Sequence, residues 1–136
     1  MYMSVVKKGR GYIYSLQYHI VWCTKYRQDV LVGSVSDSLK TILTKIAKDN
    51  DFSIVEMNTD VDHIHLLVDC TPGHQIPNML KALKGVSARL LFQSCPELKS
   101  KLYGGNLWNP SYFVSTVSEN TTQQVLDYIK SQGRGE

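Results

Sequence analysis

The sequence predicts an α+β fold, a ferredoxin-like split β-α-β sandwich with an antiparallel sheet and an added C-terminal helix. Two observations lead to this prediction. Four segments are rich in β-branched and aromatic residues, three others repeat apolar residues at helical spacing, and their order is β-α-β-β-α-β-α. The length of 136 residues, 43% of them hydrophobic, suits one domain, expected over residues 1–136.

Composition and periodicity predict the first strand and the first helix. Residues 11–24 are rich in aromatic and β-branched types, so they are expected to form one long strand. Ser34 or Ser36 can cap the following helix, because a serine hydroxyl accepts a hydrogen bond from the first turn. The apolar stripe of this helix consists of Val35, Leu39, Ile42, Leu43, Ile46 and Ala47.

A hairpin and a second helix follow. Residues 52–59 and 63–70 are expected to pair as antiparallel strands around a tight turn at 60–62. A second amphipathic helix is expected over 76–94, and Pro96 closes it. Its inward-facing residues are Ile76, Met79, Leu80, Leu83, Ser87, Leu90 and Leu91.

One more strand and one more helix complete the chain. Residues 112–117 are expected to form the fourth strand of the sheet. Asn120 can cap the last helix, with Gln123 as the partner in a capping box, and Gly133 is a usual residue at a helix end. The strands and the first two helices account for the sandwich, so this helix is an addition to it.

Two histidines, His63 and His65, stand one residue apart on the third predicted strand. Successive side chains of a strand point to opposite faces, so both imidazoles are expected on the same face. Two imidazoles side by side on one rigid strand make half of a metal site. A half-buried pair that is satisfied by backbone hydrogen bonds is the structural alternative.

Tyr128 and Gln132 lie four residues apart on the last predicted helix, and therefore on one helix face. A phenol next to a metal ion suggests covalent attack on phosphorus, with Tyr128 as the nucleophile carried by this helix. The alternative is that Tyr128 is one packing residue among the eight tyrosines of the chain.

The basic residues form clusters, although the net charge of +3 permits nucleic-acid binding without requiring it. Aromatic residues are interleaved with these cations, and stacking surfaces beside cations are what single-stranded nucleic acid needs. Core aromatics and a solvated basic face would produce the same pattern. The candidate DNA contacts are Lys7, Lys8, Arg10, Lys81, Lys84 and Arg89.

The sequence lacks the usual signals of membrane insertion and secretion, which indicates the cellular compartment of the protein. No segment approaches the roughly 18 apolar residues of a membrane span, and the N-terminus lacks the basic-then-apolar order of a signal peptide. Cys23, Cys70 and Cys95 are odd in number and widely spaced, which suggests neither disulfides nor a zinc knuckle. A cytoplasmic protein without a membrane partner is expected.

Five segments, in order and spread over nearly the whole chain, resemble the single-tyrosine HUH transposases of bacterial insertion sequences (TnpA type), which move as single-stranded DNA. The matching segments are 18–27, 62–67, 81–85, 107–113 and 128–132. The chain departs from the family pattern at Val61, where relatives often have proline, and at Lys130, where an acidic residue is common. Neither departure removes a candidate site residue.

The resemblance implies a mechanism. His63, His65 and Gln132 would bind a divalent metal ion, Mg²⁺ or Mn²⁺, and Tyr128 would cut single-stranded DNA, leaving a 5′-phosphotyrosine and a free 3′-OH. The DNA would carry hairpins near the element ends. A homodimer is implied because one tyrosine per subunit serves two cleavages: positions 124 and 132 are both glutamine. Relatives pair their sheets edge to edge, and the tyrosine helix can complete the partner's site in trans.

Three other functions remain open at this point. Another HUH nuclease, such as a replication initiator or a relaxase, shares the chemistry but usually carries further domains. A non-catalytic module that binds single-stranded DNA or RNA on a ferredoxin-like sheet would need neither the metal nor Tyr128. A metal-binding or small-molecule domain is disfavoured, because the chain has no acidic cluster to act as a base.

Overall fold

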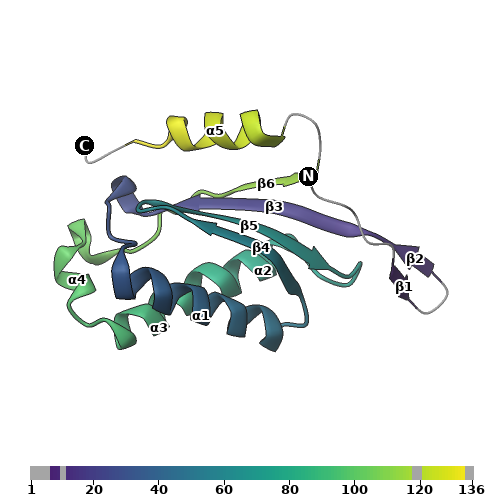
Figure 1. Ribbon diagram of the computed structural model, residues 1–136, viewed down its shortest axis with the longest axis horizontal. Helices are drawn as coiled ribbons and strands as arrows, with labels where there is room; N and C mark the ends of the chain where they lie inside the picture. Colours follow the sequence, from purple (N-terminus) through teal and green to yellow (C-terminus); the bar gives the residue numbers. More distant parts are fainter. Residues whose placement is uncertain (1–6, 10–11, 118–120, 134–136) are drawn as a thin grey trace.

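The computed structural model describes residues 7–9, 12–117 and 121–133, and its centre is a four-stranded antiparallel sheet (Figure 1). The strand order is β4-β5-β3-β6, and every neighbouring pair runs antiparallel. The strands are β3 (Leu16–Cys23), β4 (Ser53–Thr59), β5 (His63–Cys70) and β6 (Phe113–Thr116). With β5 and β3 at the centre and the two outer strands at the edges, the predicted α+β sandwich with an antiparallel sheet is confirmed.

Helices cover both faces of the sheet (Figure 1). One face carries α1 (Gly33–Asp49), α2 (Ile76–Lys81) and α3 (Ser87–Ser94), and the one described helix on the other face is α5 (Thr121–Ser131). The two predicted apolar stripes supply the helical side of the main core, with most of their members buried. The additional C-terminal helix predicted from the sequence is therefore present.

A second, smaller hydrophobic cluster lies under α5. Val21, Val125 and Ile129 are buried together, with Phe113 and Tyr128 packed partly against them. The two clusters are separate because alternate residues of β3 face opposite ways, so Val21 points to α5 while its neighbours point to the main core. This small cluster is what holds the helix that carries Tyr128.

The single strand predicted over residues 11–24 is wrong, because the structure divides that segment at Ser15. A separate two-stranded ladder pairs β1 (Lys7–Gly9) with β2 (Tyr12–Tyr14), and β3 begins only at Leu16. Tyr14 pairs with Lys7, whereas Leu16 pairs with Cys70, so the chain changes its pairing partner between them. Both halves have the same strand-like composition, which is why composition alone predicts one strand.

The second helix runs without a break over residues 76–94, as predicted, but its middle is π-helical. Between α2 and α3 lies a five-residue π-helical segment, η2 (Ala82–Val86). A π turn accommodates an extra residue in the helix and is frequent at functional sites. In the stretch expected to be loop, the structure adds a short helix, α4 (Leu98–Lys101), and a 3₁₀ turn, η3 (Tyr103–Gly105). A further 3₁₀ turn, η1 (Lys25–Arg27), follows β3.

The predicted serine caps of α1 are also wrong. The helix starts at Gly33, whose φ of +55° is a left-handed conformation that glycine adopts without steric cost, and Val32 precedes it without a side-chain cap. Ser36 instead lies with its Oγ 3.3 Å from Oγ1 of Thr59. The predicted cap Asn120 of the last helix lies outside the described residues.

Two further findings bear on the expected compartment. All three cysteines are buried free thiols. In the part of the chain that the structure describes, no helix combines the length and the apolar character that crossing a bilayer requires.

Candidate active site

The histidine pair lies on the face of the sheet that α5 covers. Residues 63 and 65 of β5 alternate with Ile64 and Leu66, which belong to the main core. Opposite them in β3 stand Cys23, which pairs with His63, and Val21, which pairs with His65 and is buried against α5. Both imidazoles are half-buried and point to one side, as the alternation predicts.

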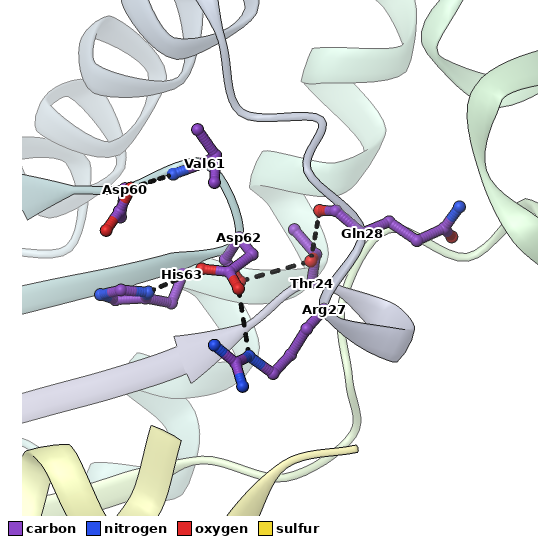
Figure 2. Close-up of polar contacts among 7 residues, drawn as sticks. All are labelled: Thr24, Arg27, Gln28, Asp60, Val61, Asp62 and His63. Atoms are coloured by element: carbon purple, nitrogen blue, oxygen red, sulfur yellow. Dashed lines mark hydrogen bonds and ion pairs between the residues drawn. The ribbon is translucent and has the colours of Figure 1, made fainter. Parts of the chain in front are cut away.

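A neighbouring carboxylate contacts the first histidine (Figure 2). Nδ1 of His63 donates a hydrogen bond to Oδ1 of Asp62 at 2.9 Å. The other carboxylate oxygen, Oδ2, accepts from Nε of Arg27 at 3.1 Å. The Asp62 side chain is only 4% exposed, so this contact is a fixed part of the site.

A third imidazole contacts the second histidine. Nε2 of His65 lies 2.8 Å from Nδ1 of the buried His19, on the neighbouring strand. Burial lowers the pKa of His65, and His19 lowers it further, so His65 is neutral, as a metal ligand must be. While this contact lasts, only Nδ1 of His65 remains for a metal ion. Its lone pair is available when Nε2 of His65 is the donor to His19.

Tyr128 lies on α5 with its ring beside Phe113, the two centroids being 5.7 Å apart. Its hydroxyl donates a hydrogen bond of 2.9 Å to Oγ of Ser111. Burial raises the pKa of the Tyr128 phenol, and the bond to Ser111 opposes this effect. The phenol is therefore protonated at neutral pH, and a nucleophilic role would require the loss of that proton.

Lys84 anchors the loop that carries Ser111. Its Nζ, in η2, donates to the carbonyl oxygens of Asn109 at 2.7 Å and of Ser111 at 3.0 Å. Burial lowers the pKa of this ammonium group. Residue 84 was predicted only as a DNA contact; in the structure it fixes the residue that Tyr128 contacts.

Gln132, the third predicted ligand, is half-buried just after the end of α5. Its Nε2 donates to Oγ of Ser131 at 3.1 Å. Within the described ranges, no hydrogen bond joins Gln132 to His63 or His65. The structure thus brings the histidines together on one strand. It places Tyr128 on α5 and Gln132 just beyond the last residue of that helix, whereas the sequence predicts both on the helix.

Cys23 connects the two halves of the site. It stands opposite His63 in the sheet and is also one of the groups that raise the pKa of Tyr128. Burial, followed by the charge of Asp62, raises the pKa of the Cys23 thiol to about 11. A thiol that stays protonated is a poor nucleophile and a poor metal ligand, so Cys23 is not a candidate for either role.

Two imidazoles and an amide oxygen are donors of the kind that bind a divalent cation with open coordination positions. Among the residues that the structure describes, no group of three or more His, Cys, Asp or Glu side chains could hold a metal ion. A metal site here therefore needs an oxygen donor of another kind beside the two imidazoles. The amide oxygen of Gln132 is such a donor, and mixed imidazole and oxygen ligation leaves room for water and phosphate.

The predicted DNA contacts fall into three groups. Lys8, Lys81 and Arg89 are exposed. Lys7 forms an ion pair of 3.0 Å with the buried Asp69, and Lys84 is held as described above. Arg10 lies outside the described residues. A recess of about 420 Å³ adjoins Lys84; its lining includes Lys25, Gly85, Phe92, Asn106 and Trp108.

Four polar residues of the site are missing from the sequence prediction. Asp62 could have been found, because a carboxylate next to a candidate ligand in the sequence is a common partner of a metal-binding imidazole. The sequence pattern gives no such signal for His19, Arg27 or Ser111. Each of these meets its partner through sheet pairing, a turn or a loop rather than through sequence spacing.

The chain is similar to known transposases over most of its length. The family described as "Transposase IS200 like" matches residues 12–132. The chain is 57% identical over 127 residues to the ISDra2 transposase TnpA of Deinococcus radiodurans, covering 93% of this chain and 91% of that protein. It is 33% identical over 119 residues to the transposase for insertion sequence element IS200 of Salmonella typhimurium, covering 88% and 78%.

Two solved structures resemble the fold. A putative transposase of Deinococcus radiodurans R1 superposes with a TM-score of 0.92 at 53% identity, covering 95% of this chain and 99% of that one. A REP-associated tyrosine transposase bound to a REP hairpin gives a TM-score of 0.57 at 17% identity, covering 95% and 69%. The second similarity, at that level of identity, concerns the fold alone.

Proposed function

The chain belongs to the family of IS200-like transposases, and on this basis we propose that it cuts and rejoins single-stranded DNA at the ends of an insertion sequence. Recognition of subterminal hairpins in that DNA is part of the proposal. The observation that carries it is the placement of Tyr128 on the helix that covers the histidine face of the sheet. A binding module would not need a tyrosine there.

The nucleophile in this proposal is the hydroxyl oxygen of Tyr128. It attacks the scissile phosphorus, a bond from the tyrosine oxygen to phosphorus forms, and the bond to the 3′ oxygen breaks. The leaving strand takes up a proton as a free 3′-OH, and the 5′ phosphate stays on the protein. Strand transfer is the reverse reaction with another 3′-OH, so no energy cofactor is needed.

The chain's own residues would prepare this attack. Tyr128 must first leave its hydrogen bond to Ser111, since that contact uses the proton that is lost on attack. His63, His65 and Gln132 are proposed to hold Mg²⁺ or Mn²⁺, which would supply positive charge at the scissile phosphate. Lys84 would hold the Ser111 loop in its place while the tyrosine leaves it.

The direct test is covalent capture. The protein is incubated with single-stranded DNA from its own element's ends and Mg²⁺, and a denaturant-resistant adduct is sought. An adduct supports the proposal, whereas hairpin binding without cleavage under any divalent metal would identify a binding module instead. Metal-dependent cleavage without an adduct would indicate a hydrolytic nuclease.

Removal of the third proposed ligand should have a mild effect. A neutral amide is a weaker ligand than an imidazole, and water can take its place, so Gln132→Ala is expected to lower the cleavage rate by about tenfold. Single-turnover cleavage at saturating Mn²⁺ measures this. Gln124→Ala, an exposed glutamine two turns earlier on α5, is the matched control. A complete loss in Gln132→Ala would mean that the glutamine does more than complete the ligand set.

A homodimer is proposed because each chain offers one nucleophile of this kind for two cleavages. Among the described residues, β4 and β6 are the edge strands of the sheet, and an edge strand can pair with a second copy. We propose that α5 completes the partner's site in trans. The predicted joint before this helix, residues 118–120, lies outside the described residues.

Mixing two inactive subunits tests the trans arrangement. A tagged heterodimer of a Tyr128→Phe chain and a His63→Ala chain is expected to cleave at one of its two sites. In trans, the intact histidines of one chain meet the intact tyrosine of the other. If each site is built from a single chain, both sites are defective and a verified heterodimer stays inactive.

The exposed cations are the best candidates for hairpin contacts. Lys8, Lys81 and Arg89 form no ion pair with any residue that the structure describes, and they can follow a phosphate backbone. Lys7 is already paired with Asp69, and Lys84 already donates to the carbonyl oxygen of Ser111. Their contribution to DNA binding should therefore be smaller.

A further inference from the structure

A buried carboxylate lies between the candidate ligand His63 and the guanidinium group of Arg27 (Figure 2). Asp62 gives one oxygen to each partner, at 2.9 Å and 3.1 Å. Side-chain exposure is 4% for Asp62 and 18% for Arg27, so the pair is largely withdrawn from water. A carboxylate at this depth needs partners for both oxygens, and these two contacts provide them.

The contact with Asp62 determines where His63 carries its proton. An ionised carboxylate can only accept hydrogen bonds, so Nδ1 of His63 is the donor and carries the ring proton of the neutral imidazole. Nε2 is then left with its lone pair, which is the form in which an imidazole nitrogen binds a metal ion. Turning the ring over would break the bond to Asp62.

An unusual backbone turn brings Arg27 to Asp62. Tyr26 and Arg27 have φ angles of 57° and 51°, in the left-handed region that residues other than glycine rarely adopt. The backbone N–H of Arg27 donates to the carbonyl of Thr24, and that of Thr24 donates to the carbonyl of Asp62, both at 2.9 Å. Strained residues of this kind cluster at functional sites, where surrounding contacts hold them.

We propose that Asp62, oriented by Arg27, is a positioning residue that holds His63 in the Nδ1-protonated tautomer and keeps Nε2 available as a metal ligand. The part that concerns the metal rests on the proposed function. The part that concerns the tautomer stands on the metal-free protein alone.

The isosteric variant Asp62→Asn gives a distinctive expectation. Arg27 can only donate, so the amide oxygen of the new side chain is expected to face Arg27. Its NH₂ group then faces His63 and donates to Nδ1, which moves the ring proton to Nε2. The variant keeps the size of the side chain, while the backbone carbonyl of residue 62 still accepts from Thr24.

Nitrogen-15 NMR of histidine-labelled, metal-free protein reads the tautomer directly. Wild-type His63 is expected to be protonated on Nδ1, and Asp62→Asn to be protonated on Nε2. The matched control is Asp60→Asn, because the Asp60 carboxylate accepts from the N–H of Val61 and does not contact His63 (Figure 2). His65 should not change in either variant, since its partner is His19. An unchanged His63 tautomer in folded Asp62→Asn would overturn the proposal.

Titration with Mn²⁺ alone, followed by electron paramagnetic resonance, tests the consequence for the metal. Asp62→Asn is expected to bind Mn²⁺ about 10- to 100-fold more weakly, and Asp60→Asn as wild type. Arg27→Gln keeps the carboxylate but removes the group that orients it, so a smaller loss is expected. Wild-type affinity in Arg27→Gln would remove Arg27 from the proposal, and wild-type affinity in Asp62→Asn would overturn its metal part.

The two measurements separate this proposal from the proposed function. If wild-type protein does not bind Mn²⁺ at His63, the metal role of the proposed function fails. The NMR comparison then still decides whether Asp62 sets the tautomer. If Mn²⁺ binds and the tautomer does not depend on Asp62, this proposal fails while the proposed function stands.

Discussion

Tyr128→Phe is expected to form no covalent adduct with DNA under any divalent metal. The substitution removes the attacking oxygen and keeps the ring that packs beside Phe113. It also removes one partly exposed hydrogen bond, to Ser111, so the stability should fall by no more than about 1 kcal/mol. The measurement is adduct formation on denaturing gels, with thermal unfolding as the check on folding.

Tyr112→Phe is the matched control for this variant. Tyr112 is 40% exposed and lies next in sequence to the residue that Tyr128 contacts, but it is not on the tyrosine helix. The Tyr112→Phe protein should form the covalent adduct with DNA at the wild-type rate. Peptide mapping of the wild-type adduct should place the DNA on Tyr128, and an adduct on any other tyrosine would contradict the assignment.

Alanine at His63 or at His65 is expected to abolish cleavage and leave hairpin binding largely intact. A metal that offsets charge at the phosphate stabilises the transition state by several kcal/mol, so its loss should lower the cleavage rate by about 10²- to 10³-fold. Binding should survive because affinity for DNA comes from phosphate contacts spread over several cations. Cleavage rates and hairpin affinity are measured on the same preparations.

The two alanine variants differ in their side effects on folding. His65→Ala leaves Nδ1 of the buried His19 without the contact at 2.8 Å, at a cost of about 1–3 kcal/mol. His63→Ala leaves Asp62 with Arg27, so it is the cleaner test. Equal loss of binding and cleavage in a folded His63→Ala protein would show that the histidine acts in DNA binding rather than in chemistry.

Much of the fold could be predicted because local signals agree with the global arrangement. Helical periodicity and strand composition predict the order of the elements, and this order leads to the split β-α-β sandwich. The division at Ser15 and the π segment Ala82–Val86 could not be predicted. The division at Ser15 depends on a change of pairing partner, from β1 to β5, and neither feature changes the residue pattern.

The candidate site could be predicted only in part, for a similar reason. Alternation along β5 places His63 and His65 on one face, and helical periodicity predicts the helix that carries Tyr128, with Gln132 just past its end in the structure. The groups that hold them could not be foreseen from spacing. His19 meets His65 through strand pairing, and Ser111 meets Tyr128 across the 17 residues of sequence that separate them.

The smallness of the cluster under α5 has an energetic consequence. Val125 and Ile129 are the apolar residues of this helix that are buried, and each contributes about 1.5–3 kcal/mol to its docking. The main core does not depend on them, so α5 can open as a separate cooperative unit below the global unfolding free energy. Amide hydrogens of Thr121–Ser131 should then exchange with solvent well before those of β3 and β5. In the proposed dimer, the opened state would give the helix a route to exchange between two copies of the chain without unfolding either domain.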